Sequence, residues 1–153
     1  MKKLILVLCC IATLASCSND DDFDNYYFET MPTESVDAPE IMAVNEVYQF
    51  TVNYIKPTSC YALYDLYYQD GEEDEIDDSG ETIETIDKDF IRIIAPINAV
   101  YDDSNCEQLD ELTDVTFDFS PRETGTFRFK FWTGTDENDE DTFLVVDIPV
   151  VEE

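Results

Sequence analysis

The sequence predicts an all-β protein, a single antiparallel β-sandwich of about six to eight strands. Three observations lead to this fold class. Apolar and polar residues alternate with a period of two in several segments, no segment shows a sustained helical period, and turn-forming residues separate the segments at short intervals. Apolar residues make up 44% of the chain and aromatic residues 13%, which favours a folded core over a disordered chain.

The first predicted strand begins at Val47 and places four side chains on one face, which we expect to be buried: Tyr48, Phe50, Val52 and Tyr54. Residues 56–59 have the composition of a turn, and an extended segment rich in tyrosine follows at residues 60–68. Tyrosines fall on both faces of this segment, as expected for a strand that a neighbour only half covers.

The apolar run at residues 90–100 predicts a further strand. Pro96 lies within it, and because proline lacks the N–H of a ladder hydrogen bond we expect a bulge, a sheet edge or a strand end there. Alternation returns at residues 115–119, with Val115 followed by two phenylalanines at every second position, and at residues 127–131, where every second residue is phenylalanine. Residues 143–148 are apolar on both faces, which predicts a central strand.

An acid-rich block at residues 70–89 separates the tyrosine-rich segment at residues 60–68 from the apolar run at residues 90–100. Like charges in such a block repel one another, so it cannot pack against itself. We therefore expect a loop or a protruding hairpin.

Residues 1–16 have the features of a secretory signal peptide. Lys2 and Lys3 precede an apolar run that is shorter than the roughly 20 residues needed to cross a bilayer. The run ends in Leu-Ala-Ser-Cys17, which resembles the lipobox of bacterial lipoproteins, where the cysteine thiol takes a diacylglycerol. We expect cleavage after residue 16 and membrane anchoring through lipid on Cys17; an ordinary secretory signal with a chance cysteine is the alternative.

The acidic tract at residues 18–22 resembles the signal that directs lipoproteins of the Bacteroidota to the outer face of the outer membrane. Residue 18 is serine rather than aspartate, so the usual inner-membrane retention signal is not matched. We expect an outer-membrane protein exposed at the cell surface, with the periplasmic face as the alternative.

The mature chain divides into two predicted regions. Residues 17–40 are expected to form an acidic, flexible tether, and residues 41–153 the β-sandwich domain. The aromatic patch at residues 23–28 interrupts the tether. It either docks on the domain as an extra edge strand, which is the commoner outcome, or lies at the membrane.

Cysteine usage agrees with a location outside the cytoplasm. Of the five cysteines, Cys9 and Cys10 leave with the signal peptide and Cys17 is acylated, so that Cys60 and Cys106 remain. A lone pair in an oxidising compartment most often forms a disulfide. Two buried free thiols are the alternative.

Charge and composition exclude several functions. The formal net charge is −29, and loss of both signal-peptide lysines makes it −31 in the mature chain. Such a surface repels nucleic acid, so a nucleic-acid partner is excluded. The chain contains no histidine, which removes Ser-His-Asp and Cys-His catalysis and histidine metal ligands. We expect a protein that is not an enzyme.

One candidate metal site lies in the acidic turn at residues 134–141. Asp136, Asn138 and Glu140 offer oxygen ligands at alternate positions, as at the start of an EF-hand loop, but the glycine and the flanking helices of that motif are missing. Calcium is the one cofactor that this pattern suggests. A solvated hairpin tip, kept soluble by its charges, is the plainer interpretation and the one we favour.

A candidate binding face lies on the strand that precedes this turn. Arg128, Lys130 and Trp132 alternate with the phenylalanines and therefore share the opposite face. A basic stripe beside a tryptophan could hold a sugar or the carboxylates of a partner. The plainer interpretation is that the two cations pair with acidic cross-strand neighbours, while their stems and the indole cover the sheet.

The motifs of residues 45–151 resemble a group of small Bacteroidota lipoproteins with an immunoglobulin-like β-sandwich domain and no assigned activity. The resemblance rests on the Pro-x-x-Cys turn that ends at Cys60, on Cys106 in a polar loop, and on the Phe-Lys-Phe-Trp strand with its acidic turn. It implies an immunoglobulin-like fold and the Cys60–Cys106 pairing, and it implies no catalytic residue. The acidic block at residues 70–89 departs from the pattern of the group.

Two functions are compatible with these observations. The first is a lipid-anchored envelope lipoprotein that acts as a non-catalytic interaction or structural module and binds a protein or a glycan. The second is a calcium-binding envelope domain whose acidic loops are ordered by the metal.

Overall fold

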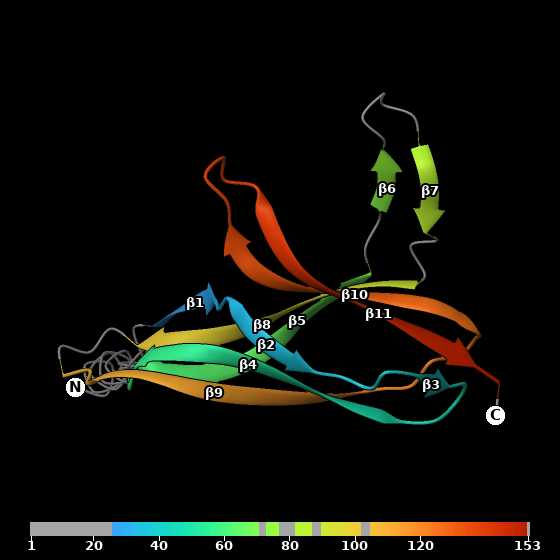
Figure 1. Ribbon diagram of the computed structural model, residues 1–153. Helices are drawn as coiled ribbons and strands as arrows, with labels where there is room; N and C mark the ends of the chain where they lie inside the picture. The colour runs from blue at the N-terminus through green and yellow to red at the C-terminus, as the bar shows by residue number, and fades with distance from the viewer. Residues whose placement is uncertain (1–25, 71–72, 77–81, 87–89, 102–104, 153) are drawn as a thin grey trace, which may run out of the picture.

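The computed structural model describes residues 26–70, 73–76, 82–86, 90–101 and 105–152. These residues fold almost entirely as strands, in one six-stranded sheet (sheet A), one three-stranded sheet (sheet B) and a separate hairpin (Figure 1). The strands are β1 (Tyr26–Thr30), β2 (Thr33–Asp37), β3 (Met42–Ala43), β4 (Tyr48–Thr58), β5 (Tyr61–Asp70), β6 (Glu73–Ile76), β7 (Thr82–Ile86), β8 (Ile91–Tyr101), β9 (Gln108–Phe119), β10 (Gly125–Thr135) and β11 (Asp141–Val151). The prediction of an all-β sandwich is confirmed, and the described residues include no helix that could cross a membrane.

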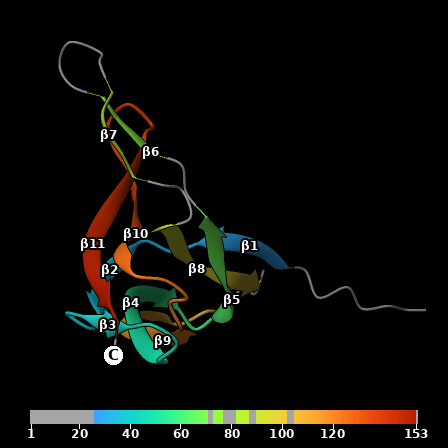
Figure 2. The ribbon, with the colours of Figure 1, turned by 90° about the vertical axis from the view of Figure 1, so that its right-hand side faces the viewer.

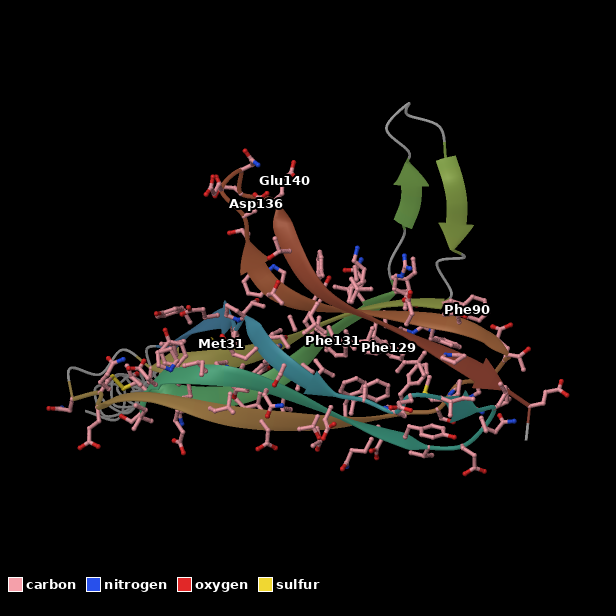
Figure 3. All side chains as sticks on the ribbon, in the orientation of Figure 1. Met31, Phe90, Phe129, Phe131, Asp136 and Glu140 are labelled. Atoms are coloured by element: carbon pink, nitrogen blue, oxygen red, sulfur yellow. A yellow bond between two sulfur atoms is a disulfide. The ribbon has the colours of Figure 1, made fainter. Side chains whose placement is uncertain are left out.

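The predicted alternation places the core between the two sheets. Phe50 and Val52 of β4 are fully buried, and Tyr54 is nearly so. They face Phe129 and Phe131 of β10, which Figure 3 shows between the sheets. Phe50 and Phe129 meet with their ring centroids 4.7 Å apart. The period of two therefore identified the buried faces of both strands correctly.

Strand β8 organises sheet A. On one edge it pairs with β5 along nearly its whole length. On the other edge its first part pairs with β10, and its second part, from Ile97, pairs with β1. Pro96 lies where β8 changes partner, and its carbonyl oxygen accepts a hydrogen bond from the backbone N–H of Met31 at 2.8 Å. Pro96 therefore lies inside a strand with neighbours on both edges, rather than at the expected bulge, sheet edge or strand end. The missing N–H is tolerated because neither β10 nor β1 pairs with β8 at this residue.

The prediction of an antiparallel sandwich is only partly right, because sheet A is mixed. β10 runs parallel to β8, and β11 runs parallel to β3, whereas every other pairing is antiparallel in the part of the chain that the structure describes. The cause is the path of the chain. After β8 the chain crosses to sheet B as β9, and it then returns to sheet A as β10. Because β9 runs in the opposite direction to both, β10 runs in the same direction as β8.

The flexible tether expected at residues 17–40 ends earlier than predicted. From residue 26 the chain belongs to the sheets, since β1 pairs with β8 and β2 pairs with β4. Met31 and Thr33 are each 4% exposed. The aromatic residues of β1 thus dock as an extra strand, which was the favoured alternative. Residues 1–25, including Cys17, lie outside the described residues.

The expected disulfide joins Cys60 to Cys106, with their Cα atoms 5.4 Å apart. It lies at the end of the sandwich where β4 finishes and β9 begins, because Thr58 pairs with Gln108. The chain enters sheet A at the same end, since Tyr26 pairs with Tyr101 and the N–H of Tyr101 donates to the carbonyl oxygen of Cys60 at 3.1 Å.

Two hairpins rise from the outer side of sheet A, as Figures 1 and 2 both show. One consists of β6 and β7, which pair with each other and lie within the acid-rich block, as predicted for a protruding hairpin. The other is the distal part of β10 and β11.

Candidate functional site

The bend in the β10–β11 hairpin begins at an irregularity in the register between Trp132 and Gly134. Gly134 has φ of +118°, a conformation that residues with a side chain rarely adopt. Thr142 fixes the bend: its hydroxyl donates to the carbonyl oxygen of Gly134 at 3.0 Å and accepts from the hydroxyl of Thr133 at 2.9 Å. Beyond this point the hairpin leaves the plane of sheet A (Figure 1).

The three residues of the predicted binding face lie on the outer side of β10, where side chains of β11 engage each of them. The guanidinium of Arg128 donates two hydrogen bonds to the carboxylate of Asp147, at 2.8 and 2.9 Å. The ammonium of Lys130 lies 4.7 Å from the ring centre of Phe143. The indole N–H of Trp132 donates to Asp141 at 2.8 Å. 

Arg128 pairs with an acidic cross-strand neighbour, as the plainer interpretation expected, whereas Lys130 lies against an aromatic ring of β11. The hydrogen bonds from the guanidinium of Arg128 hold the pKa of Asp147 below its usual value, although burial acts in the opposite direction. Trp132 is the member of the predicted face that also reaches a hollow in the surface.

That hollow, the outer-face hollow, has a volume of about 390 Å³ and is lined by eight residues: Thr30, Tyr67, Gln69, Ile93, Ala95, Trp132, Asp141 and Phe143. Its floor is β8, since this strand lies between β5 and β10. Tyr67 and Gln69 of β5 stand on one side. The aromatic rings of Trp132 and Phe143, which are register partners, stand on the other side at the bent hairpin.

Small side chains on β8 make this hollow possible. Ala95 is paired with Tyr67 and is only 3% exposed, although it lies on the outward side of the sheet. The methyl group of Ala95 is therefore covered by larger neighbours and leaves a depression between them. A bulky side chain at this position would fill the floor of the hollow.

A second aromatic group, the four-ring cluster, lies further along the same face, towards the disulfide. It consists of Tyr26, Phe28, Tyr64 and Tyr101. The rings of Phe28 and Tyr64 are 4.4 Å apart, and the ring of Tyr26 lies 5.4 Å from Phe28 and 5.8 Å from Tyr101. All four residues are more than 40% exposed. Such a cluster of solvent-exposed rings is unusual for a surface that meets only water.

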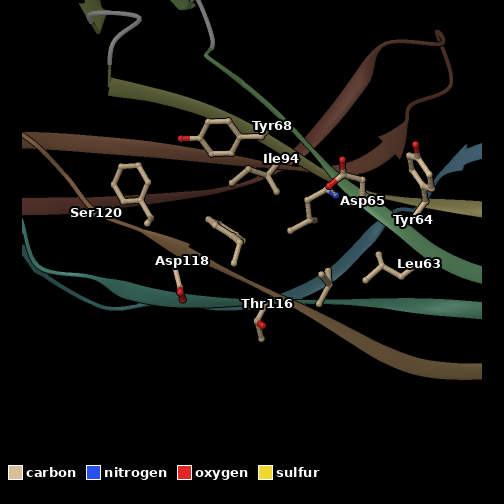
Figure 4. A pocket seen from close by; sticks show the side chains of 12 residues that line it. Leu63, Tyr64, Asp65, Tyr68, Ile94, Thr116, Asp118 and Ser120 are labelled. Carbon is tan, nitrogen blue, oxygen red and sulfur yellow. Dashed lines mark hydrogen bonds between the residues drawn. The ribbon is translucent and has the colours of Figure 1, made fainter.

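A different hollow, the edge cleft, opens between β5 of sheet A and β9 of sheet B and has a volume of about 640 Å³ (Figure 4). Ile94 and Tyr68 face β9 across it, whereas Thr116 and Asp118 point to the far side of β9 (Figure 4). The carboxylate of Asp65 accepts a hydrogen bond from the adjacent backbone N–H of Leu66 at 2.8 Å. The polar groups of the edge cleft therefore do not converge on a common point.

The candidate calcium ligands lie at the tip of the bent hairpin (Figure 3). The carboxylate of Asp136 accepts hydrogen bonds from the backbone N–H groups of Asn138 at 2.7 Å and of Glu140 at 3.0 Å. Both hydrogen bonds lower the pKa of Asp136, and the bond from Glu140 has the larger effect. Asp136 thus closes the turn. Within the described ranges, no three Asp, Glu, Cys or His side chains gather as metal ligands.

Sequence reasoning found one of the three aromatic side chains of the outer-face hollow, Trp132, and missed the other two. Tyr67 and Phe143 come from other strands, and their convergence depends on the strand order of sheet A and on the bend of the hairpin. One signal was present in the sequence. Thr-Gly-Thr at residues 133–135 follows the strict alternation of β10 and marks the place where the strand departs from it.

No protein-family model, no curated protein and no solved structure matches this chain. The geometry of the outer face therefore has to carry any assignment of function.

Proposed function

We propose that the protein is a lipid-anchored, non-catalytic binding module of the cell envelope and that the outer face of sheet A is its interaction surface. One observation carries the second part of this proposal. The outer face carries both the four-ring cluster and the outer-face hollow. The rings of the cluster are exposed to solvent, and Tyr64, for example, is 62% exposed. Aromatic side chains supply most of the energy at binding surfaces, and exposed rings gathered on one face favour a role in binding.

The chemistry of the hollow supports a module without catalytic activity. Among the described residues, its lining includes one carboxylate, that of Asp141, and this group already accepts the indole N–H of Trp132. Hydrolysis of a glycosidic bond requires two carboxyl groups placed on either side of the bond. A site with one carboxylate and three aromatic rings is suited to binding.

The envelope location rests on the N-terminal sequence and agrees with the disulfide. Cysteine pairs are oxidised outside the cytoplasm, and the Cys60–Cys106 bridge fits such a compartment. Cleavage before Cys17 would leave roughly nine residues before β1, which reach at most about 30 Å. In this proposal the disulfide end of the domain lies towards the outer membrane, at the cell surface or, as the alternative, on its periplasmic side.

We also propose that the sandwich is a variant of the immunoglobulin-like arrangement. The order β2-β4-β9 in sheet B corresponds to strands A, B and E of that fold, and the β10–β11 pair corresponds to F and G. The variation is that β8, rather than β5, lies beside β10. An experimental structure with β5 next to β10 would exclude this variant arrangement.

The anchoring is tested by replacing Cys17. In cells that produce the protein, Cys17→Ser is expected to release it from the membrane fraction and to prevent incorporation of labelled palmitate. Protease added to intact cells should degrade the unmodified protein if it is exposed at the surface. Membrane association and labelling that persist in the Cys17→Ser variant would exclude lipid anchoring at this residue.

The interaction surface is tested by binding of the purified domain to envelopes isolated from the native bacterium. Replacing two exposed rings of the four-ring cluster, Tyr26→Ser with Tyr64→Ser, is expected to reduce this binding. The control is Leu112→Ser, which removes a 60% exposed apolar side chain from β9 of sheet B. Equal binding by both variants and by the unmodified domain would contradict the proposed surface.

A further inference from the structure

We propose that the outer-face hollow binds a neutral oligosaccharide. This inference rests on the proposed function and names the ligand class of the same face. It is carried by three properties of the hollow: aromatic rings on opposite sides, hydrogen-bonding groups between them, and the absence of a cation among the described residues that line it.

The aromatic rings provide surfaces for sugar rings. A pyranose presents patches of C–H groups on its two faces, and these carry a small positive charge that is attracted to the electron-rich face of an aromatic ring. Tyr67 on β5 stands across the floor of the hollow from Trp132 and Phe143. The floor itself is aliphatic, formed by Ile93 and Ala95. A chain of sugar rings lying over β8 would meet an aromatic side chain at each wall.

The polar groups match the hydroxyl groups of a sugar, each of which both donates and accepts hydrogen bonds. Thr30 supplies a hydroxyl, Gln69 an amide and Asp141 a carboxylate. The hydroxyl of Tyr67 donates to the amide oxygen of Gln69. Asp141 accepts one hydrogen bond from Trp132, and a carboxylate can accept about four.

Electrostatics select a neutral ligand. Among the described residues that line the hollow, Asp141 is the one that carries a charge. The ammonium of Lys130 lies nearby, 4.7 Å from the ring centre of Phe143, but it is a single cation in a chain whose formal charge is −29. A sulfated or uronic-acid-containing chain would be repelled by Asp141 and by this net charge. The volume of about 390 Å³ falls within the range of ligand sites, about 300–1,000 Å³, so it suits a short stretch of a longer chain.

The chain provides its own reporter, because Trp132 is its single tryptophan. The experiment titrates the purified domain with cellohexaose, maltohexaose, mannohexaose and xylohexaose, and with an oligogalacturonate as the anionic comparison. Tryptophan emission and calorimetric heat are both recorded. We expect at least one neutral hexaose to shift the emission saturably, and no response to the oligogalacturonate.

Variants then locate the binding. Tyr67→Ala keeps the tryptophan reporter and removes one wall, so the dissociation constant should rise roughly tenfold, the scale of one lost ring contact. Tyr67→Phe keeps the ring and should bind within a few-fold of the unmodified domain. Leu112→Ser, on sheet B, should leave the constant unchanged. Unaltered circular dichroism in each variant shows that the fold is retained.

Two results would overturn the inference: no emission change or heat with any of the four neutral hexaoses, or a sugar affinity that Tyr67→Ala leaves unchanged. Either result is distinguishable from failure of the proposed function. If envelope binding is still lost in the Tyr26→Ser, Tyr64→Ser variant, the face remains an interaction surface, but its partner is not a neutral glycan bound in the outer-face hollow.

Discussion

In one half of the sandwich the space between the sheets is filled by phenylalanine rings, whereas in the other half it contains polar side chains next to a disulfide. The phenylalanine half holds seven rings connected through ring contacts, with neighbouring centroids between 4.7 and 6.4 Å apart. They are Phe50, Phe90, Phe117, Phe119, Phe127, Phe129 and Phe131. Buried rings of this kind are the largest single contributors to apolar burial.

The disulfide half is built differently. The hydroxyl of Tyr54 donates to the amide oxygen of Asn98 at 3.4 Å, and that of Tyr61 donates to Glu29 at 2.9 Å. Three buried polar side-chain atoms have no hydrogen-bond partner among the described residues. Two of them, Oγ1 of Thr33 and Nδ2 of Asn98, lie here, and the third, Nε of Arg92, lies beside Phe127 in the phenylalanine half. Buried polar groups without partners are unfavourable, so this interior stabilises the fold less than a ring-filled one would.

The comparison teaches that the two halves are held together by different means. Apolar burial is sufficient where the rings meet. In the other half the polar interior is compensated by a covalent bridge, and several aromatic side chains lie on the outer face of the sheet instead of inside. The half with the weaker core is thus the half that exposes the four-ring cluster.

The largest effect is expected in the phenylalanine half. Phe129→Ala removes a fully buried ring that contacts Phe50, Phe119, Phe127 and Phe131, and should lower the free energy of unfolding by about 3–5 kcal/mol. Urea unfolding measures this, with Leu112→Ser as the surface control, expected within about 0.5 kcal/mol of the unmodified protein. A loss below about 1 kcal/mol would mean that the rings do not dominate this half.

A smaller effect, located in the other half, is expected from removal of the disulfide. Cys60→Ser with Cys106→Ser opens a loop of 46 residues and should cost about 2–4 kcal/mol. Hydrogen exchange sharpens the comparison. Amide protection should fall most at Tyr101, whose N–H donates to Cys60, and least at Phe129. Equal loss at both amides would show that the halves unfold as one unit.

The polar interior of the disulfide half predicts a loss of stability at alkaline pH. Burial, followed by the hydrogen bond to Glu29, raises the pKa of Tyr61 to about 12 from an ordinary value of 10.0. The folded state therefore holds the phenolic proton more tightly than the unfolded chain does. The resulting contribution to stability is complete below pH 10 and is lost as the pH rises towards 12.

Tyr61→Phe should accordingly show a shallower fall in melting temperature between pH 10 and 12 than the unmodified protein. The corresponding difference in the free energy of unfolding should be smaller than the full ~1.4 kcal/mol per unit of pKa shift, because solvent screens this partly exposed group. Parallel pH profiles of the two proteins would contradict a role of Tyr61 in this half.

The smallest effect, close to zero, is expected from calcium. The carboxylate of Asp136 already accepts two backbone N–H groups at the hairpin tip, which lies outside both halves. A ligand that binds only the folded state must raise its stability. Millimolar calcium should therefore leave the melting temperature unchanged relative to a chelator. A rise would establish the calcium-binding alternative, and hydrogen exchange would then show which loop it orders.

Much of the fold could be predicted from the sequence because it depends on local patterns. The period of two placed Phe50 and Phe129 in the core, and the two cysteines left after the expected processing suggested the bridge. The parallel pairing of β8 with β10 could not be predicted, since alternation specifies which face of a strand is buried and not which strand lies beside it. Docking of the aromatic patch as an edge strand was expected, but the pairing of β2 with β4 depended on an edge that only the assembled sheets provide.

The candidate site divides in the same way. The sequence by itself determined that Arg128, Lys130 and Trp132 share the outward face of one strand, because side chains alternate along any strand. Tertiary structure decided what they do there. Cross-strand partners on β11 engage the two cations, and the bend at Gly134 places Trp132 beside a depression whose other wall, at Tyr67, lies 65 positions earlier in the chain. Convergence of distant residues depends on strand order and curvature, which are properties of the packed sheets.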